Sequence, residues 1–190
     1  MGRDSLGQFQ VWNIRSMNFT PIGIEGAFGI SSSTKLDFRG SLTRLFDLDS
    51  PMNMFNLVQS SIVHNPIIGT LRGLHFQSEP FSENKVVECV AGRVFDVLLD
   101  LRPGSSTLGK YLGLEIGLAC DYLGVLVPAG CAHGYITLEA NSTLIYFMDK
   151  RFSAEHSRGI RWDDPSFGII WPIAPTLISE RDANWPSLIP

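Results

Sequence analysis

The sequence predicts an all-β fold of the sandwich or barrel class. Short runs rich in β-branched and aromatic residues are separated by Gly, Pro, Asn or Ser turns at spacings of roughly 8 to 12 residues. Apolar residues recur with the period of a helix almost nowhere in the chain. We therefore expect one core enclosed by about eight or more strands, with short peripheral helices only near the C-terminus.

Composition is that of an ordinary soluble domain. The chain has 190 residues, a hydrophobic fraction of 44% and a formal net charge of −4. A chain of this length buries about 70% of its unfolded surface and can hold a core without disulfides or metals. Because no cluster of Lys and Arg is present, we expect no nucleic-acid partner and no membrane association. A signal-peptide core is also missing, which predicts a cytoplasmic protein.

The domain limits follow from the patterning. Residues 1–16 are weakly patterned and are expected to form an N-terminal extension, whereas residues 17–190 are expected to form a single domain. The three cysteines, Cys89, Cys120 and Cys131, are widely spaced and include no C-x-x-C pair. We interpret them as small buried hydrophobic residues in a reducing compartment.

The N-terminal part of the domain predicts strands joined by tight turns. Residues 19–33 are apolar pieces cut by Gly and Pro. In residues 35–47 the apolar residues alternate on both sides of Arg39-Gly40, a pattern typical of a hairpin. Residues 51–56 have mild helical or loop character, and residues 57–63 predict another strand.

The stretch GTLRGLHFQ, residues 69–77, is the most informative of the predicted strands. Simple alternation places His75 and Gln77 on one face and Arg72 on the other, unless a bulge intervenes. We expect the face with His75 to point inward. If Arg72 and His75 both reach a ligand, the strand must twist or bulge near Gly73, or Arg72 must reach around an edge.

The remaining strands follow at regular intervals. The loop QSEPFSEN precedes the runs KVVECVAG, RVFDVLLD and GKYLGLEIG, and residues 123–149 predict three more strands joined by a PAG and an EANS turn. Residues 153–176 are expected to form an ordered loop with one or two short turns. Ser179 has the position of a helix N-cap, with Asp182 three residues later.

Four residues on this β-rich core are candidates for chemistry: His75, Lys85, His133 and Tyr146. Each also has a purely structural explanation. A histidine among apolar residues is usually a satisfied core residue, a lysine at a strand start is normally solvated, and a tyrosine in a strand usually packs. His133, next to Gly134, could only brace a turn. No pair among the four is specific by spacing alone.

Metal and nucleotide motifs are missing. Small β-barrels that bind iron or nickel typically offer H-x-H, but here the second position is Gln77. His75, Lys85 and His133 make a poor set of ligands because a protonated ammonium cannot coordinate a metal. No G-x-S-x-G elbow, GxGxxG or GxxxxGK loop occurs. We expect no metal and no other cofactor.

Several motifs in order resemble the dTDP-4-dehydrorhamnose 3,5-epimerase family. They are GTLRGLHFQ, NKVVECVAGRVFDVLLDLRPGSSTLGKYLGLEI, VPAGCAHGY, RGIRWDDPSFGIIWP and LISERD. The resemblance runs from about Leu36 to Asp182. It implies a double-stranded β-helix (a cupin-type jelly roll), a homodimer, and epimerisation of a nucleotide-diphosphate 4-keto-6-deoxyhexose at C3 and/or C5 for deoxysugar and cell-surface polysaccharide biosynthesis.

The resemblance also implies roles for ten residues. His75 matches the base beside the C4 ketone, Asp182 the carboxylate that pairs with it, and Tyr146 the acid on the opposite face. Lys85 matches the lysine near the keto oxygen. The positions that match substrate-binding or neighbouring site residues are Arg72, Arg39, His133, Gln59, Gln77 and Asp96, with Arg39 corresponding to a diphosphate-binding arginine. Asp182 has an alternative explanation as a residue of the helix cap.

Two segments depart from the family pattern, at residues 59–65 and 147–152. Both line or flank the sugar and base pockets in the family. They leave open a mono-epimerase acting on a GDP- or CDP-linked 4-keto sugar. A non-catalytic sugar-binding jelly roll is a further alternative, which the intact set of acid and base residues argues against.

Overall fold

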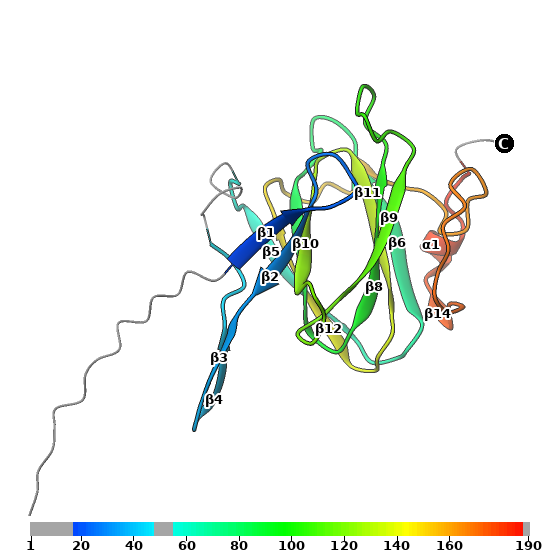
Figure 1. The fold of residues 1–190 in the computed structure, drawn as a ribbon. Helices are drawn as coiled ribbons and strands as arrows, with labels where there is room; N and C mark the ends of the chain where they lie inside the picture. Colours follow the sequence, from blue (N-terminus) through cyan, green and yellow to red (C-terminus); the bar gives the residue numbers. More distant parts are fainter. Residues whose placement is uncertain (1–16, 48–54, 188–190) are drawn as a thin grey trace, which may run out of the picture.

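The computed structural model describes residues 17–47 and 55–187, and these form two facing, mainly antiparallel sheets with a projecting hairpin (Figure 1). The first sheet has the strand order β1-β2-β10-β7-β12-β5 and the second the order β13-β6-β11-β8-β9, with β14 paired to β6. Strands far apart in the sequence are neighbours in both sheets. This is the two-sheet jelly roll that was expected, and the all-β prediction is confirmed.

The strands are short, as the turn spacing predicts. The first sheet contains β1 (Met17–Pro21), β2 (Phe28–Ser32), β10 (Gly124–Val127), β7 (Lys85–Ala91), β12 (Ser142–Met148) and β5 (Gln59–Asn65). The second contains β13 (Ser157–Gly159), β6 (Thr70–Gln77), β11 (Cys131–Thr137), β8 (Val94–Asp100), β9 (Tyr111–Ile116) and β14 (Leu177–Ile178). The hairpin is β3 (Thr34–Asp37) with β4 (Gly40–Thr43), and the helix α1 spans Glu180–Ala183.

The main core lies between the two sheets. Alternating residues of β7, such as Val87 and Cys89, meet Leu98 of β8 and Tyr135 of β11 there, and all four are buried. Alternation in β7 explains this, because every second side chain of a strand points to the same face. Lys85 is on the inward face with Val87 and Cys89, as predicted, at the end of the strand where the core gives way to a cavity.

The outer faces of both sheets are covered by chain segments. Phe46 and Phe55 pack on Val86 and Phe147 of the first sheet. Residues of the 160–171 segment, including Ile160 and Trp171, pack on the second. The predicted ordered loop over residues 153–176 is therefore a cover for the second sheet, and it also contributes the short strand β13.

The β3–β4 hairpin extends away from the two sheets (Figure 1). It turns at Phe38-Arg39, one residue before the expected position, and Asp37 pairs with Gly40 in its register. Three of its apolar side chains are exposed: Leu36, Phe38 and Leu42, with Phe38 exposed by 97%. The hairpin was predicted from alternation alone, but nothing in the described part of this chain buries its apolar residues.

Strand β6 contains the irregularity on which the site depends. His75 pairs with His133 and Arg72 pairs with Tyr135 on β11, so β6 has one residue more than β11 between these two pairs. An extra residue in one strand is a β-bulge and changes the face on which the following side chains lie. The bulge, one of the solutions considered for this strand, puts Arg72 and His75 against the same cavity.

Gly73 and Gly134 are needed where the bulge meets β11. Gly73 has φ +127°, and a Cβ there would be 2.5 Å from the Cα of Gly134. A Cβ on Gly134 would lie 2.7 Å from the carbonyl oxygen of Arg72. Only glycine combines a positive φ with such a close approach of two backbones.

Other predictions hold with small differences. The strand expected over residues 57–63 is β5 at 59–65, and one helix of four residues is found near the described C-terminal end. Cys89 and Cys131 are buried as expected, whereas Cys120 is partly exposed. Residues 1–16 and most of the segment 51–56 lie outside the described residues. In the described part no helix is long and apolar enough to cross a membrane.

Candidate active site

A cavity of about 330 Å³ opens between the ends of the two sheets. β5, β7 and β12 of the first sheet supply one wall, and β6 and β11 of the second supply the other. Six of the ten sequence-predicted site residues line it: Arg72, His75, Gln77, Lys85, His133 and Tyr146. Asp96 and Asp182 lie directly behind two of these, whereas Gln59 and Arg39 are not among the lining residues.

His75 and Asp182 form a hydrogen-bonded pair in the cavity wall. The Nε2 of His75 lies 2.7 Å from Oδ1 of Asp182, and the backbone N–H of Gly73 donates to Oδ2 at 3.2 Å. Burial alone would raise the pKa of Asp182, but the hydrogen bond and charge of His75 and the Gly73 N–H outweigh it and lower that pKa. With Asp182 ionised, His75 donates from Nε2, and in the neutral imidazole Nδ1 is then the nitrogen that can accept a proton.

The helix cap and the contact with His75 are compatible roles of Asp182. Ser179 is the N-cap of α1, and its hydroxyl accepts from the backbone N–H of Asp182 at 3.1 Å. The cap uses the backbone of Asp182 and leaves its carboxylate for His75. The cap thus fixes the position of the carboxylate, so the two explanations offered by the sequence apply together.

His133 and Asp96 form a second pair of the same kind. The Nε2 of His133 lies 2.8 Å from Oδ2 of Asp96, and both side chains are almost fully buried. The other oxygen of Asp96, Oδ1, is buried without a hydrogen-bond partner. Because His133 and His75 are opposite each other in the β6–β11 register, the two imidazoles belong to one wall.

Tyr146 faces these histidines from the opposite sheet. Its ring meets that of His133 edge to face, with centroids 6.1 Å apart. Burial first, and then the proximity of Tyr135 and Asp96, raise the pKa of Tyr146 well above its ordinary value. The phenol therefore stays protonated at neutral pH and can act as an acid.

Lys85 is nearly buried and paired with a carboxylate. Its Nζ lies 2.7 Å from Oε1 of Glu83, and the two side chains are exposed by only 7% and 3%. Arg72 is also anchored, because its Nε donates to Oδ1 of Asn65 at 2.9 Å, and Tyr135 donates to the same oxygen at 3.2 Å. Both cations are therefore held in fixed positions at the cavity.

Gln77 and Gln59 brace the cavity wall. The backbone N–H of Ser153 donates to Oε1 of Gln77 at 2.6 Å, and that of Phe152 donates to Oε1 of Gln59 at 3.0 Å. Gln77 also donates from Nε2 to Oε2 of Glu83 and to the carbonyl of Phe81. Both amides thus hold the segment that carries Phe152, which itself lines the cavity.

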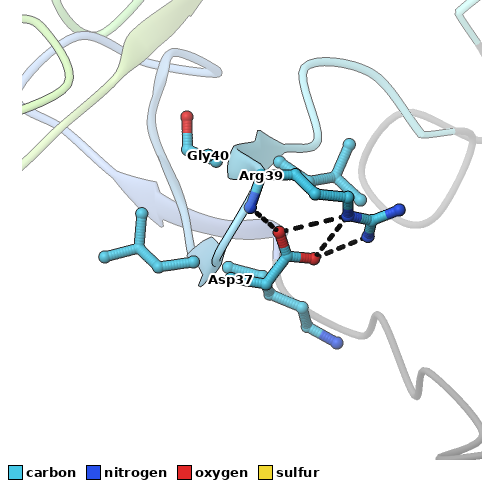
Figure 2. A pocket seen from close by; sticks show the side chains of 7 residues that line it. Asp37, Arg39 and Gly40 are labelled. Carbon is cyan, nitrogen blue, oxygen red and sulfur yellow. Dashed lines mark hydrogen bonds and ion pairs between the residues drawn. The ribbon is translucent and has the colours of Figure 1, made fainter.

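Arg39 lies on the projecting hairpin, apart from this cavity. Figure 2 shows its guanidinium folded over Asp37, with the two side chains joined by hydrogen bonds as short as 2.6 Å. The side chain is 70% exposed. The described chain does not bring Arg39 to the other predicted residues.

Sequence reasoning missed several residues of the site. Glu83, Asn65 and Arg181 hold or line the cavity, but none was assigned a role, although Arg181 lies within the LISERD motif and Asn65 ends the segment 59–65. The EN pair before Lys85 was the available signal for Glu83. Among the described residues no group of three or more His, Cys, Asp and Glu could hold a metal ion.

Comparisons with known proteins identify the family and agree with the fold. The family model described as dTDP-4-dehydrorhamnose 3,5-epimerase matches residues 21–189. The chain is 47% identical to the dTDP-4-dehydrorhamnose 3,5-epimerase of Sinorhizobium fredii over 133 residues, which is 70% of this chain and 68% of that protein. It is 31% identical to the dTDP-4-dehydrorhamnose 3-epimerase of Streptomyces niveus over 172 residues, 88% of this chain and 82% of the other.

A solved structure extends the likeness to three dimensions. The dTDP-4-dehydrorhamnose 3,5-epimerase of Bacillus anthracis, with TDP and PPi bound, superposes with a TM-score of 0.84 at 29% identity. The match covers 91% of this chain and all of the other.

Proposed function

Because the chain belongs to the dTDP-4-dehydrorhamnose 3,5-epimerase family, we propose that His75, Lys85, Tyr146 and Asp182 carry out its reaction. The protein is a carbohydrate epimerase, an isomerase that acts on a nucleotide-linked 4-keto-6-deoxyhexose. The observation that supports this assignment is the His75–Asp182 pair on one wall of a cavity with Tyr146 on the other.

The reaction begins with removal of a proton from a carbon next to the C4 ketone. The Nδ1 of His75 accepts this proton, and Asp182 stabilises the imidazolium that forms. Negative charge then develops on the keto oxygen. Lys85 stabilises the enolate, and one such donor contributes roughly 3 to 4 kcal/mol to the transition state.

Inversion requires that the proton return from the other face. Tyr146 projects from the first sheet, whereas His75 projects from the second, so the sugar ring lies between acid and base. The phenol delivers its proton to the enolate carbon opposite His75. Arg72, His133 with Asp96, Gln77 and Gln59 bind the substrate or support the groups that do.

The proposal also covers the nucleotide that carries the sugar and the number of sugar carbons that are inverted. We assign dTDP as the carrier, because the similar Bacillus anthracis protein binds TDP. Two inverted centres, C3 and C5, are the main proposal. Inversion at one centre is the second candidate, favoured by the likeness to a 3-epimerase and by the altered segments 59–65 and 147–152.

The protein is further proposed to be a cytoplasmic homodimer. The projecting hairpin supports the dimer, because it exposes Leu36, Phe38 and Leu42 together with Arg39. A second copy would bury these apolar residues. Docked on the partner, the hairpin carries Arg39 toward the partner's cavity, where its guanidinium binds the substrate diphosphate.

Solvent exchange tests the function. In D₂O, a dTDP-linked 4-keto-6-deoxyhexose should gain deuterium at C3 and C5, and NMR of the product identifies the inverted centres. Deuterium at C3 alone would select the 3-epimerase. Tight binding of the nucleotide sugar without exchange would instead support a non-catalytic sugar-binding jelly roll.

A further inference from the structure

Glu83 is the only carboxylate among the described residues that line the cavity. The charged and titratable side chains around it are otherwise cationic or neutral: Arg72, His75, Lys85, His133, Tyr146 and Arg181. Such a lining suits a substrate that carries a diphosphate. A carboxylate in this position repels the same substrate unless its charge is matched inside the protein.

Both oxygens of Glu83 are occupied by protein groups. Oε1 lies 2.7 Å from Nζ of Lys85, and Oε2 accepts from Nε2 of Gln77 at 3.0 Å. Gln77 is itself fixed, because it also donates to the carbonyl of Phe81 and accepts from the backbone of Ser153. The Glu83 side chain is only 3% exposed, so little of it is left for a ligand.

The loop that presents Glu83 is fixed on its other side as well. Asn84 donates from its backbone and its side chain to the carboxylate of Asp149, at 2.8 and 2.7 Å. The backbone N–H of Ala129 donates to Oδ1 of Asn84 at 3.0 Å. The carboxylate therefore reaches Lys85 from a rigid support, which is what a positioning residue requires.

A buried ammonium needs such a partner. Taking a charge out of water is costly, and the cost is recovered only when an opposite charge and further hydrogen bonds are in place. The nearby thiol of Cys131 offers no anion, because burial raises its pKa to about 12 and keeps it neutral. Within residues 17–47 and 55–187, no other anionic side chain lines the cavity beside Lys85.

We propose that Glu83, held by Gln77, is a positioning residue that orients the ammonium of Lys85 for enolate stabilisation. This inference rests on the proposed function and adds to it. Glu83 acts through Lys85 and does not touch the substrate. Its removal should therefore slow proton exchange while leaving the affinity for dTDP unchanged.

The test is a double-mutant cycle on the full chain, followed by deuterium exchange into the 4-keto sugar. Glu83→Gln should lower the exchange kcat by about tenfold, and Lys85→Met by roughly 10²- to 10³-fold. In the Lys85→Met background, Glu83→Gln should have no further effect on exchange and should raise Tm, because it removes an unpaired buried charge. Glu79→Gln, an exposed carboxylate of the same loop, is the matched control and should change neither quantity.

The split between exchange kcat and dTDP affinity separates a positioning role from a packing role. If Glu83 positions Lys85, Glu83→Gln lowers the exchange kcat and leaves the Kd for dTDP unchanged. An unchanged kcat, an equal loss of dTDP affinity, or effects of the two substitutions that simply add, would overturn the inference even if the variant is less stable. Absence of exchange in the unsubstituted protein would instead overturn the proposed function.

Discussion

His75 and Asp182 meet across more than half of the chain, with Nε2 and Oδ1 only 2.7 Å apart. We expect Asp182→Asn to lower the exchange kcat by about 10²- to 10⁴-fold, because an amide no longer fixes the tautomer or stabilises the imidazolium. The helix cap should persist, because it uses the backbone N–H of residue 182. Exchange kinetics by NMR measures the loss.

The control for this substitution is on the same helix. Glu180 is exposed and lies in the same first turn. Glu180→Gln should leave exchange unchanged and alter Tm only slightly. An Asp182→Asn enzyme with normal kcat would show that His75 does not depend on this carboxylate.

Tyr146→Phe separates proton removal from proton return. Without the phenol, His75 can still abstract a proton and return it to the same face, so exchange should continue while inversion at C5 is lost. Product NMR reports exchange and stereochemistry in one experiment. Equal loss of both would show that Tyr146 is not the acid.

The all-β fold could be predicted from sequence because it depends on local patterns, whereas the opposite faces of acid and base were implied only by the family resemblance. Alternation in β7 put Lys85, Val87 and Cys89 on one face, and a cap signal at Ser179 marked the helix that carries Asp182. The bulge in β6 was only one of several solutions, because its cause is a contact between Gly73 and Gly134, far apart in the chain.

The hydrogen bonds that support the cavity wall could not be predicted either, because they also join residues that are far apart in the chain. Gln77 and Gln59 were assigned to the substrate, yet their amide oxygens accept from the backbone of residues 152–153. The partner of an amide depends on which loop folds over it, and strand periodicity carries no such information. Glu83 was missed because its role comes from a contact with Lys85 and not from a motif.

Gly73→Ala should damage both the fold and the site. The new Cβ would lie 2.5 Å from the Cα of Gly134, at a φ that side chains rarely adopt. Gly104→Ala is the matched control, because that glycine also has a positive φ but no atom within 4 Å. We expect Gly73→Ala to cost at least about 2 kcal/mol more than the control in denaturant unfolding. Equal costs would mean that the close approach does not matter.

Glu88 predicts a pH-dependent stability that is independent of catalysis. It is fully buried on β7, neither carboxylate oxygen has a hydrogen-bond partner, and burial raises its pKa from 4.5 to about 8. The folded protein therefore binds a proton that the unfolded chain releases above pH 4.5. The contribution of Glu88 to the unfolding free energy is greatest below pH 4.5 and is lost as the pH rises toward about 8. The loss is at most about 1.4 kcal/mol for each pH unit.

Urea unfolding at a series of pH values checks this prediction. The slope of the unfolding free energy against pH should flatten in Glu88→Gln, because an amide does not titrate. The exposed Glu155 provides a control, and Glu155→Gln should keep the wild-type slope. A Glu88→Gln protein with an unchanged slope would mean that Glu88 is ionised or partnered in solution.

Arg39 allows a test of the dimer and of its own role together. If the hairpin delivers Arg39 to the partner's cavity, Arg39→Ala and His75→Ala should each be nearly inactive as pure proteins. In a mixed dimer one site then receives both defects and the other receives neither. Random mixing should recover about a quarter of the wild-type activity, because half of the dimers are mixed and each has one intact site. No recovery on mixing, with dimers present by light scattering, would place the action of Arg39 within its own chain.

Leu36→Ser is expected to weaken the dimer without removing any charged group, and it distinguishes loss of assembly from loss of the guanidinium.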